Sequence, residues 1–376
     1  MTTSGPDIGG PAPCQGGPQA GGFSPTPAAL AGTTTCQQGA EYRVTYQLGP
    51  VTVELNTDQP AVGDYLGEFY PASAAVSARP DWIVDARVGP GGEMRRNAYG
   101  VAFAADAHVR TVVVRASDPL SLAMTTRKAV RDALVGFCET RQATMLHASA
   151  IADDRRVIII AGDKGSGKTT LALRCALVHG MRFLSNDHLI MYPGTPPGVA
   201  LHSQLVLTSL PTPIPVKVGT YLDLEQILPE PWDTEGADVA RYRAMPRRDR
   251  YQHDVRVLYT YRRLGQDNPV IMPLGSPHGG PRVLVVLARY APDGRPADDP
   301  VPLADPVTAL MEHVRFDWTF DPVLNYQYVP RRDRDRAAYA ADARRLAEAL
   351  AARADVVSWA HAGDPAPLLE LLGGQS

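Results

Sequence analysis

A continuous apolar run marks the middle of the chain at Val157–Ile160, where four β-branched residues follow one another. Such a run is typical of a strand that is buried on both faces. The next apolar segment, Leu171–Val178, repeats at helical spacing, and Gly180 stands where a helix C-cap is expected. The pattern therefore predicts a strand, a short turn and a helix in direct succession.

Upstream of this unit, alternating apolar and polar residues predict a region rich in β-strands. The expected strands, the first two forming a hairpin, are Tyr42–Leu48, Val51–Leu55, Trp82–Val88, Val101–Ala105 and Val109–Arg115. Pro119 then opens a predicted helix. Residues 1–40 are rich in Gly and Pro and poor in charge, so we expect a disordered tail. We divide the chain into this tail, a small β-rich region over 41–117 and a larger domain over 118–376.

The larger domain alternates predicted strands and helices. The predicted strands are Thr144–Ile151, Met181–Ser185, His188–Tyr192, Leu205–Leu210, Pro215–Leu224, Arg282–Leu287 and Val356–Trp359. The predicted helices cover 305–314, 333–352 and 365–372. This mixture indicates an α/β (α+β) protein.

The turn between the central strand and its helix has the sequence GDKGSGKT, which fits the phosphate-binding motif G-x-x-x-x-G-K-[ST]. Its glycines let successive backbone N–H groups point at one anion. Lys168 would add a cation for the β- and γ-phosphates, and Thr169 a hydroxyl for Mg²⁺. We expect ATP to bind at Gly162, Asp163, Lys164, Gly165, Ser166, Gly167, Lys168, Thr169 and Thr170. A turn that binds nothing would leave Lys168 buried without an anion, which is costly.

Two further polar positions are expected beside this turn. Asn186 and Asp187 follow the strand after the motif helix, and a carboxylate there can serve as a metal ligand or a base. His147 lies on the preceding strand, one hairpin away. Each also has a purely structural alternative, as a turn carboxylate or a packed strand histidine.

An arginine-dense segment extends from Arg241 to Arg263. It is either a solvated face or a surface that grips phosphates or an acidic substrate. On the second hypothesis, Arg247 and Arg248 are candidate substrate contacts.

The net charge and hydropathy of the chain limit the kinds of binding partner that we expect. The 376 residues carry a formal charge of only −3, so we expect no nucleic acid partner. No apolar run approaches the ~18 residues of a membrane span, so we expect no membrane. The chain has no Lys or Arg before Arg43 and no apolar segment typical of a secretory signal. We therefore expect a cytoplasmic protein.

These residues together resemble the catalytic core of the HPr kinase/phosphorylase family. The resemblance rests on HASA from His147, on GDKGSGKTT from Gly162 and on FLSND ending at Asp187, and it covers residues 140–193. That family carries a His-Gly strand, a loop beginning Gly-Asp-Ser-Gly and an Asp-Asp pair at similar spacing. The resemblance implies a phosphoenolpyruvate-carboxykinase-like P-loop core, here with a small β-rich N-terminal layer.

The resemblance also implies roles for single residues. His147 would lie near the transferred phosphoryl group, Lys168 would neutralise phosphate charge, and Asp187 would take a proton from a hydroxyl or hold the metal. Asn186 stands where the family has its first Asp, so it can offer Mg²⁺ a carbonyl oxygen but no charge. The family's downstream Glu-Ile-Arg-Gly signature is absent, so we expect a substrate other than HPr. Homo-oligomers are common in the family, and we expect one here.

Kinases similar to this core also phosphorylate Ser or Thr hydroxyls of ribosomally made peptides. We therefore expect an ATP- and Mg²⁺-dependent kinase that acts on a peptide or small protein. Two alternatives stay open: a kinase for a small-molecule hydroxyl, and a P-loop protein that senses nucleotide without transferring a phosphoryl group. A carboxykinase-type lyase has less support, because we find no second set of metal-binding His and Lys residues.

Overall fold

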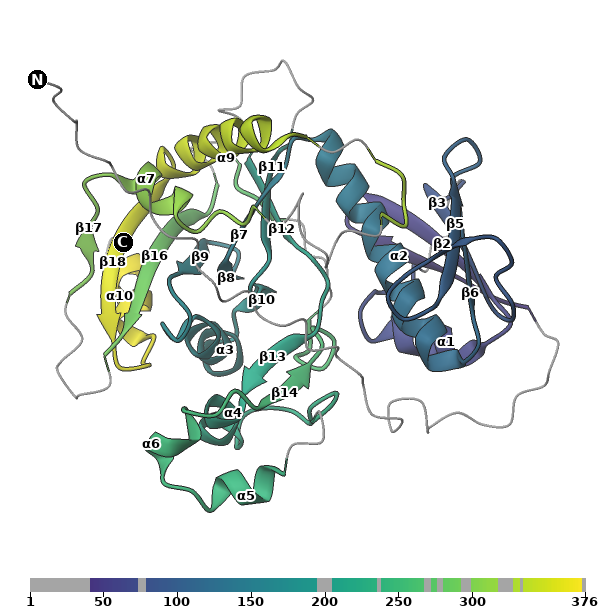
Figure 1. Ribbon diagram of the computed structural model, residues 1–376. Helices are drawn as coiled ribbons and strands as arrows, with labels where there is room; N and C mark the ends of the chain where they lie inside the picture. The colour runs from purple at the N-terminus through teal and green to yellow at the C-terminus, as the bar shows by residue number, and fades with distance from the viewer. Residues whose placement is uncertain are drawn as a thin grey trace, which may run out of the picture.

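The computed structural model confirms the mixed α/β class, with several sheets and helices packed around them (Figure 1). It describes residues 41–73, 79–194, 205–234, 238–266, 272–275, 280–291, 299–316, 327–331 and 334–373. The predicted tail over residues 1–40 lies outside these ranges.

The first strands form a mixed sheet in the order β1-β2-β3-β6-β5-β4. Their bounds are β1 Tyr42–Leu48, β2 Val51–Thr57, β3 Trp82–Val88, β4 Arg95–Arg96, β5 Ala102–Asp106 and β6 Thr111–Ala116. The predicted hairpin and the other predicted strands of this region are therefore confirmed to within two residues at each end.

Helices α1 (Pro60–Gly67) and α2 (Pro119–Thr140) pack against each other and against this sheet (Figure 1). Asp118 caps α2 by accepting a hydrogen bond from the Ser121 backbone N–H at 2.8 Å. The same helix also contacts the rest of the molecule, because Phe137 packs edge-on against Tyr192. The division of the chain at residue 118 stays a prediction.

A second sheet forms the centre of the larger part, in the order β10-β8-β9-β16-β18-β17 (Figure 1). Its strands are β8 Ala148–Ala152, β9 Arg156–Ala161, β10 Arg182–Ser185, β16 Arg282–Tyr290, β17 Val301–Pro302 and β18 Ala354–His361. Strand β9 pairs antiparallel with β8 and parallel with β16, which in turn pairs parallel with β18. The loop after β9 therefore leaves the sheet at the same edge as the ends of β16 and β18.

Strand β9 is buried on both faces, as its apolar run predicted. Ile158 and Ile160 pack in one hydrophobic cluster with α3 (Lys168–His179), and Val157 and Ile159 pack in another with α9 (Arg336–Ala351). The sheet thus lies between two layers of helix, and this packing fixes where the loop after β9 begins.

The single strand predicted over Thr144–Ile151 is interrupted at His147. Strand β7 (Thr144–Leu146) joins a separate antiparallel sheet, whereas β8 joins the central sheet. The break arises because the backbone N–H of His147 donates to the His313 oxygen at 2.8 Å, outside both sheets. The separate sheet has the order β15-β12-β11-β7, with β11 Leu189–Pro193, β12 Leu205–Ser209 and β15 Met272–Pro273.

The strand predicted over Pro215–Leu224 is wrong in its second half. Strand β13 ends at Lys217, and the next residues form α4 (Val218–Leu224). The β-branched residues there favour a strand, but as a helix the segment buries Val218, Thr220 and Leu224. Tertiary packing therefore overrides the local preference.

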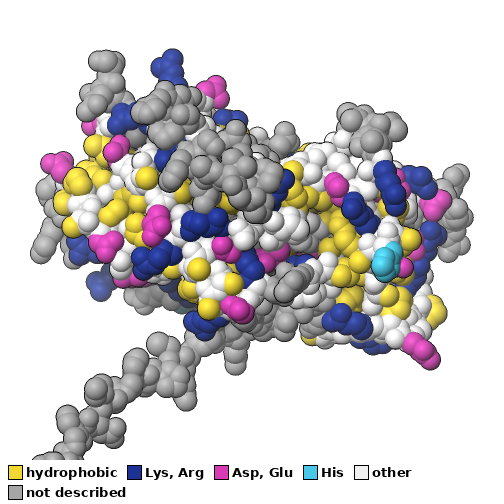
Figure 2. Space-filling model, turned by 90° about the horizontal axis from the view of Figure 1, so that it is seen from above, with side chains coloured by type: hydrophobic (Ala, Val, Ile, Leu, Met, Phe, Trp, Pro, Cys, Tyr) yellow, Lys and Arg dark blue, Asp and Glu magenta, His cyan; other side chains and the backbone are white. Residues whose placement is uncertain are grey.

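Strands β13 (Ile214–Lys217) and β14 (Arg256–Tyr259) pair antiparallel in a separate two-stranded sheet. The remaining helices are α5 Val239–Arg243, α6 Arg247–Arg250, α7 Pro306–Met311 and α10 Ala366–Gly373. Within the described ranges, no helix combines the length and hydropathy that a bilayer span requires. Seen from above, basic and acidic side chains are interspersed over the described surface (Figure 2).

Candidate functional site

The glycine-rich loop, residues 162–167, connects β9 directly to α3. Gly162, Gly165 and Gly167 all have positive φ, of 143°, 90° and 86°, so three of its six residues adopt conformations that favour glycine. Gly180 ends α3 in the left-handed conformation, as the sequence predicted. The predicted succession of strand, glycine-rich turn and helix is therefore confirmed.

Two of these glycines are also required by close neighbours. A Cβ on Gly162 would lie 2.5 Å from the backbone oxygen of Ala288 in β16. A Cβ on Gly167 would lie 2.6 Å from Cε1 of His361, at the end of β18. The loop is thus pressed against the ends of both parallel strands.

The side chain of Lys168 folds back over the loop. Its Nζ donates to the backbone oxygens of Gly162 at 2.8 Å and Asp163 at 3.1 Å. Only 6% of the residue is exposed. Burial lowers the pKa of Lys168, and the carboxylates of Asp187 and Asp163 oppose that shift. A buried ammonium held only by carbonyl oxygens and two nearby carboxylates is a strong attractor for an anion.

A chain of hydrogen bonds joins the first residues of α3 to the end of β10. The hydroxyl of Thr169 donates to Oδ1 of Asn186 at 2.9 Å, and Nδ2 of Asn186 donates to Oδ2 of Asp187 at 3.3 Å. The backbone N–H of Asn186 is held by the hydroxyl of buried Tyr261 at 3.3 Å. Hydroxyl, amide and carboxylate oxygens are thereby brought together beside the loop.

His147 lies on the other side of Asp187. Its Nε2 is 3.5 Å from Oδ1 of Asp187. Burial alone would raise the pKa of Asp187, but the hydrogen bond and charge of His147, together with the charges of His188 and Lys168, outweigh it and hold the pKa below its usual 3.8. Asp187 is therefore ionised at neutral pH. The structure brings His147, Lys168, Thr169, Asn186 and Asp187 into one connected site.

The other predicted residues divide between the site and its surroundings. The hydroxyl of Thr170 lies 3.2 Å from the hydroxyl of Thr220 in α4. Lys164 is exposed and forms an ion pair of 3.5 Å with Asp254. The guanidinium of Arg247 donates two hydrogen bonds to the carboxylate of Asp223, from Nε to Oδ1 and from Nη2 to Oδ2. Arg248 is exposed. Substrate contact by Arg247 and Arg248 stays a prediction.

His361 is a site residue that the sequence did not reveal. The ring is 1% exposed, with Nε2 2.8 Å from the Ser166 backbone oxygen and Nδ1 accepting from the Gly363 N–H at 3.0 Å. These partners require a proton on Nε2 and none on Nδ1. Burial lowers the pKa of His361, which favours this neutral form. In the sequence, its one signal is that it follows the predicted strand Val356–Trp359 by two residues.

A second missed segment crosses the end of β7. His313 accepts the His147 N–H through its backbone oxygen, and Nη1 of Arg315 lies 3.1 Å from Nε2 of His188. Burial lowers the pKa of the His313 side chain, and the charge of nearby Lys168 lowers it further. The segment around His313 and Arg315, distant in sequence, therefore lies next to His147 and His188, which flank Asp187.

A divalent cation bound beside Asp187 would have a few side-chain oxygens as protein ligands. Within the described ranges, no group of three or more His, Cys, Asp or Glu side chains is arranged to hold a metal. The oxygens of Thr169, Asn186 and Asp187 are hard ligands that suit Mg²⁺, which keeps several of its waters and shares its shell with phosphates.

In comparisons with known proteins, no family model and no curated protein matches this chain at a significant level.

Proposed function

We propose that this protein is an ATP-dependent kinase with a phosphoenolpyruvate-carboxykinase-like P-loop core, and that it phosphorylates a Ser or Thr hydroxyl of a peptide or small protein. The observation that carries the proposal is the position of Asp187. An ionised carboxylate lies beside His147 and is electrostatically coupled to Lys168, on the edge of the sheet where the glycine-rich loop begins.

In this mechanism the loop N–H groups and Lys168 hold the β- and γ-phosphates of ATP. Asp187 accepts the proton of the acceptor hydroxyl. The hydroxyl oxygen forms a bond to the γ-phosphorus while the bond from that phosphorus to the bridging oxygen breaks, and ADP leaves. His147 holds the Asp187 carboxylate in place and keeps it ionised.

Thr169, Asn186 and Asp187 would hold Mg²⁺, which supplies charge neutralisation of the β- and γ-phosphates when bound. Their existing contacts support this, because the three side chains already meet through hydrogen bonds of 2.9 and 3.3 Å. The amide of Asn186 contributes an oxygen without a charge, so Asp187 supplies the negative charge of this set.

A peptide acceptor is supported by the basic side chains next to Asp187 and by the exposed arginines of α6. The test is intact-mass analysis of candidate peptides encoded beside the gene, incubated with the protein, ATP and Mg²⁺. We expect a gain of about 80 Da, one phosphoryl group, that is lost in Lys168→Ala and Asp187→Asn. Tight ATP binding without any modified peptide would redirect the search to small-molecule hydroxyls.

A further inference from the structure

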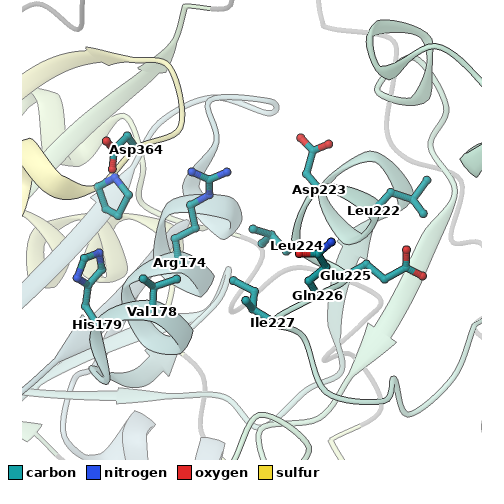
Figure 3. Close-up of a pocket in the computed structure, with 11 residues that line it drawn as sticks. Arg174, Val178, His179, Leu222, Asp223, Leu224, Glu225, Gln226, Ile227 and Asp364 are labelled. Atoms are coloured by element: carbon teal, nitrogen blue, oxygen red, sulfur yellow. The ribbon is translucent and has the colours of Figure 1, made fainter.

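A cavity opens between α3, α4 and residues 364–365, beyond the first turn of α3 (Figure 3). Its volume is about 460 Å³, which is within the range of about 300–1,000 Å³ typical of small-molecule sites. The side chains that decide its chemistry are Arg174, Val178, Asp223, Glu225, Ile227 and Asp364. None of them belongs to the site around Asp187.

The cavity begins one helical turn from the glycine-rich loop. Thr170 contacts Thr220 at 3.2 Å, so the first turns of α3 and α4 lie side by side. Arg174 and Val178 follow Thr170 at spacings of four residues, and therefore share its face of α3. Figure 3 shows both side chains extending from α3 at the cavity.

This location suits one end of a nucleotide. The γ-phosphate of a triphosphate in the loop would lie toward Lys168 and Asp187, and its α-phosphate toward the first N–H groups of α3. Thr170 stands at that point, and its hydroxyl contacts Thr220 of α4. The nucleoside would therefore leave the loop on the side where the cavity opens.

The lining matches the groups of a nucleoside. Nε of Arg174 is buried and has no hydrogen-bond partner among the described residues, so a rotation of the side chain into the cavity would give it an acceptor such as a ribose oxygen or a base nitrogen. Asp364 uses Oδ1 to cap the Ala366 N–H at 3.0 Å, and a carboxylate can accept further bonds from ribose hydroxyls. Val178 and Ile227 are 58% and 42% exposed and offer an apolar surface to a base.

Other occupants fit less well. Asp223 and Glu225 are each paired with an arginine, Arg247 and Arg243, so neither carboxylate offers a free charge to a ligand. Among the described lining residues, a polyanion would meet the carboxylate of Asp364 and a single arginine, Arg174, for which no ion pair is formed. A ligand with one hydrogen-bond acceptor for Arg174, several donors and a flat apolar ring satisfies the whole lining.

Building on the kinase proposal, we propose that this cavity is the nucleoside subsite, which receives the ribose and base of the phosphoryl donor. The glycine-rich loop would then bind the phosphates alone, and the cavity would distinguish a nucleotide from inorganic polyphosphate.

The test compares ATP with inorganic tripolyphosphate, which has no nucleoside, by calorimetry with Mg²⁺. Val178→Trp would fill the cavity, and we expect it to raise the Kd for ATP about tenfold, while the Kd for tripolyphosphate stays within about twofold. Arg174→Ala should also weaken ATP binding more than tripolyphosphate binding. Val301→Trp is the matched control, because Val301 is 59% exposed in β17 and does not line the cavity.

The outcomes separate this inference from the kinase proposal. Unchanged ATP affinity in Val178→Trp, or an equal loss for both ligands, overturns the nucleoside subsite while leaving the loop assignment intact. A wild-type protein that binds neither ATP nor tripolyphosphate overturns both proposals.

Discussion

A methyl group on Gly167 would lie 2.6 Å from Cε1 of His361, so the last turn of the glycine-rich loop is fitted against a histidine from the far end of the chain. We expect Gly167→Ala to displace this ring and to raise the Kd for ATP at least about tenfold. Gly180→Ala is a matched control, because Gly180 also has a positive φ, of 67°, but has open space around it. Both variants should lose about 1 kcal/mol of stability to backbone strain, and calorimetry with ATP should separate them. Equal ATP affinities would show that the contact does not shape the loop.

The role of Asp187 can be tested by a substitution that keeps the size of its side chain. Asp187→Asn should lower kcat about 10³-fold, because the amide cannot accept the hydroxyl proton. Measured without Mg²⁺, the Kd for ATP should change little, since Lys168 and the loop remain. Asp154→Asn, at the fully solvated turn between β8 and β9, is the control. Retained turnover in Asp187→Asn would exclude Asp187 as the base.

His147 should act through Asp187. In His147→Ala, the pKa of Asp187 rises because the hydrogen bond and charge that lowered it are gone. We expect the acid limb of the pH–rate profile to move to higher pH and kcat to fall about 10²-fold. A profile of unchanged shape, as expected for the exposed His108→Ala control, would indicate that His147 is only a packed residue.

The pH dependence of stability should report on His361. Burial puts its folded pKa below the usual 6.5, so between these two values the unfolded chain binds a proton that the native state does not. The free energy of unfolding should therefore fall as pH drops through 6.5, and level off below the folded pKa. His361→Gln should have a shallower slope, measured by chemical denaturation from pH 7.5 to 5. His313 contributes with the same sign and stays constant in this comparison, since burial also lowers its pKa.

The proposed substrate contacts of Arg247 and Arg248 in α6 can be tested one at a time. Arg248→Ala should raise KM for a peptide acceptor about fivefold with little effect on KM for ATP, because it removes one exposed charge contact. Arg247→Ala should do the same and also free Asp223. Arg182→Ala, an exposed arginine on β10, is the control. Acceptor KM values that match the control would leave the segment as a solvated face.

The local parts of the candidate site could be read from the sequence. The apolar run of β9, the glycines of the loop and the cap of α3 lie within 24 consecutive positions, from 157 to 180, and each follows from backbone preferences of neighbouring residues. Asn186 and Asp187 could be placed for the same reason, since they follow the next strand along the chain.

The rest depended on contacts between distant segments. His361, His313 and Arg315 reach the site through strand order and loop packing, which leave no periodic signal nearby. The strand expected to end at Trp359 continues to His361 because β16 pairs with it along its whole length. Likewise, the helix at Val218–Leu224 and the break at His147 arise from tertiary packing that overrides local preference.

The parallel pairing of β9, β16 and β18 has a consequence for synthesis of the protein. The loop emerges from the ribosome long before β16, and β18 with His361 emerges later still. Until then the loop lacks both strand ends against which Gly162 and Gly167 are pressed. The nascent chain can therefore contain every residue of the motif and still lack the finished loop, so the loop acquires its geometry only after β18 has been synthesised.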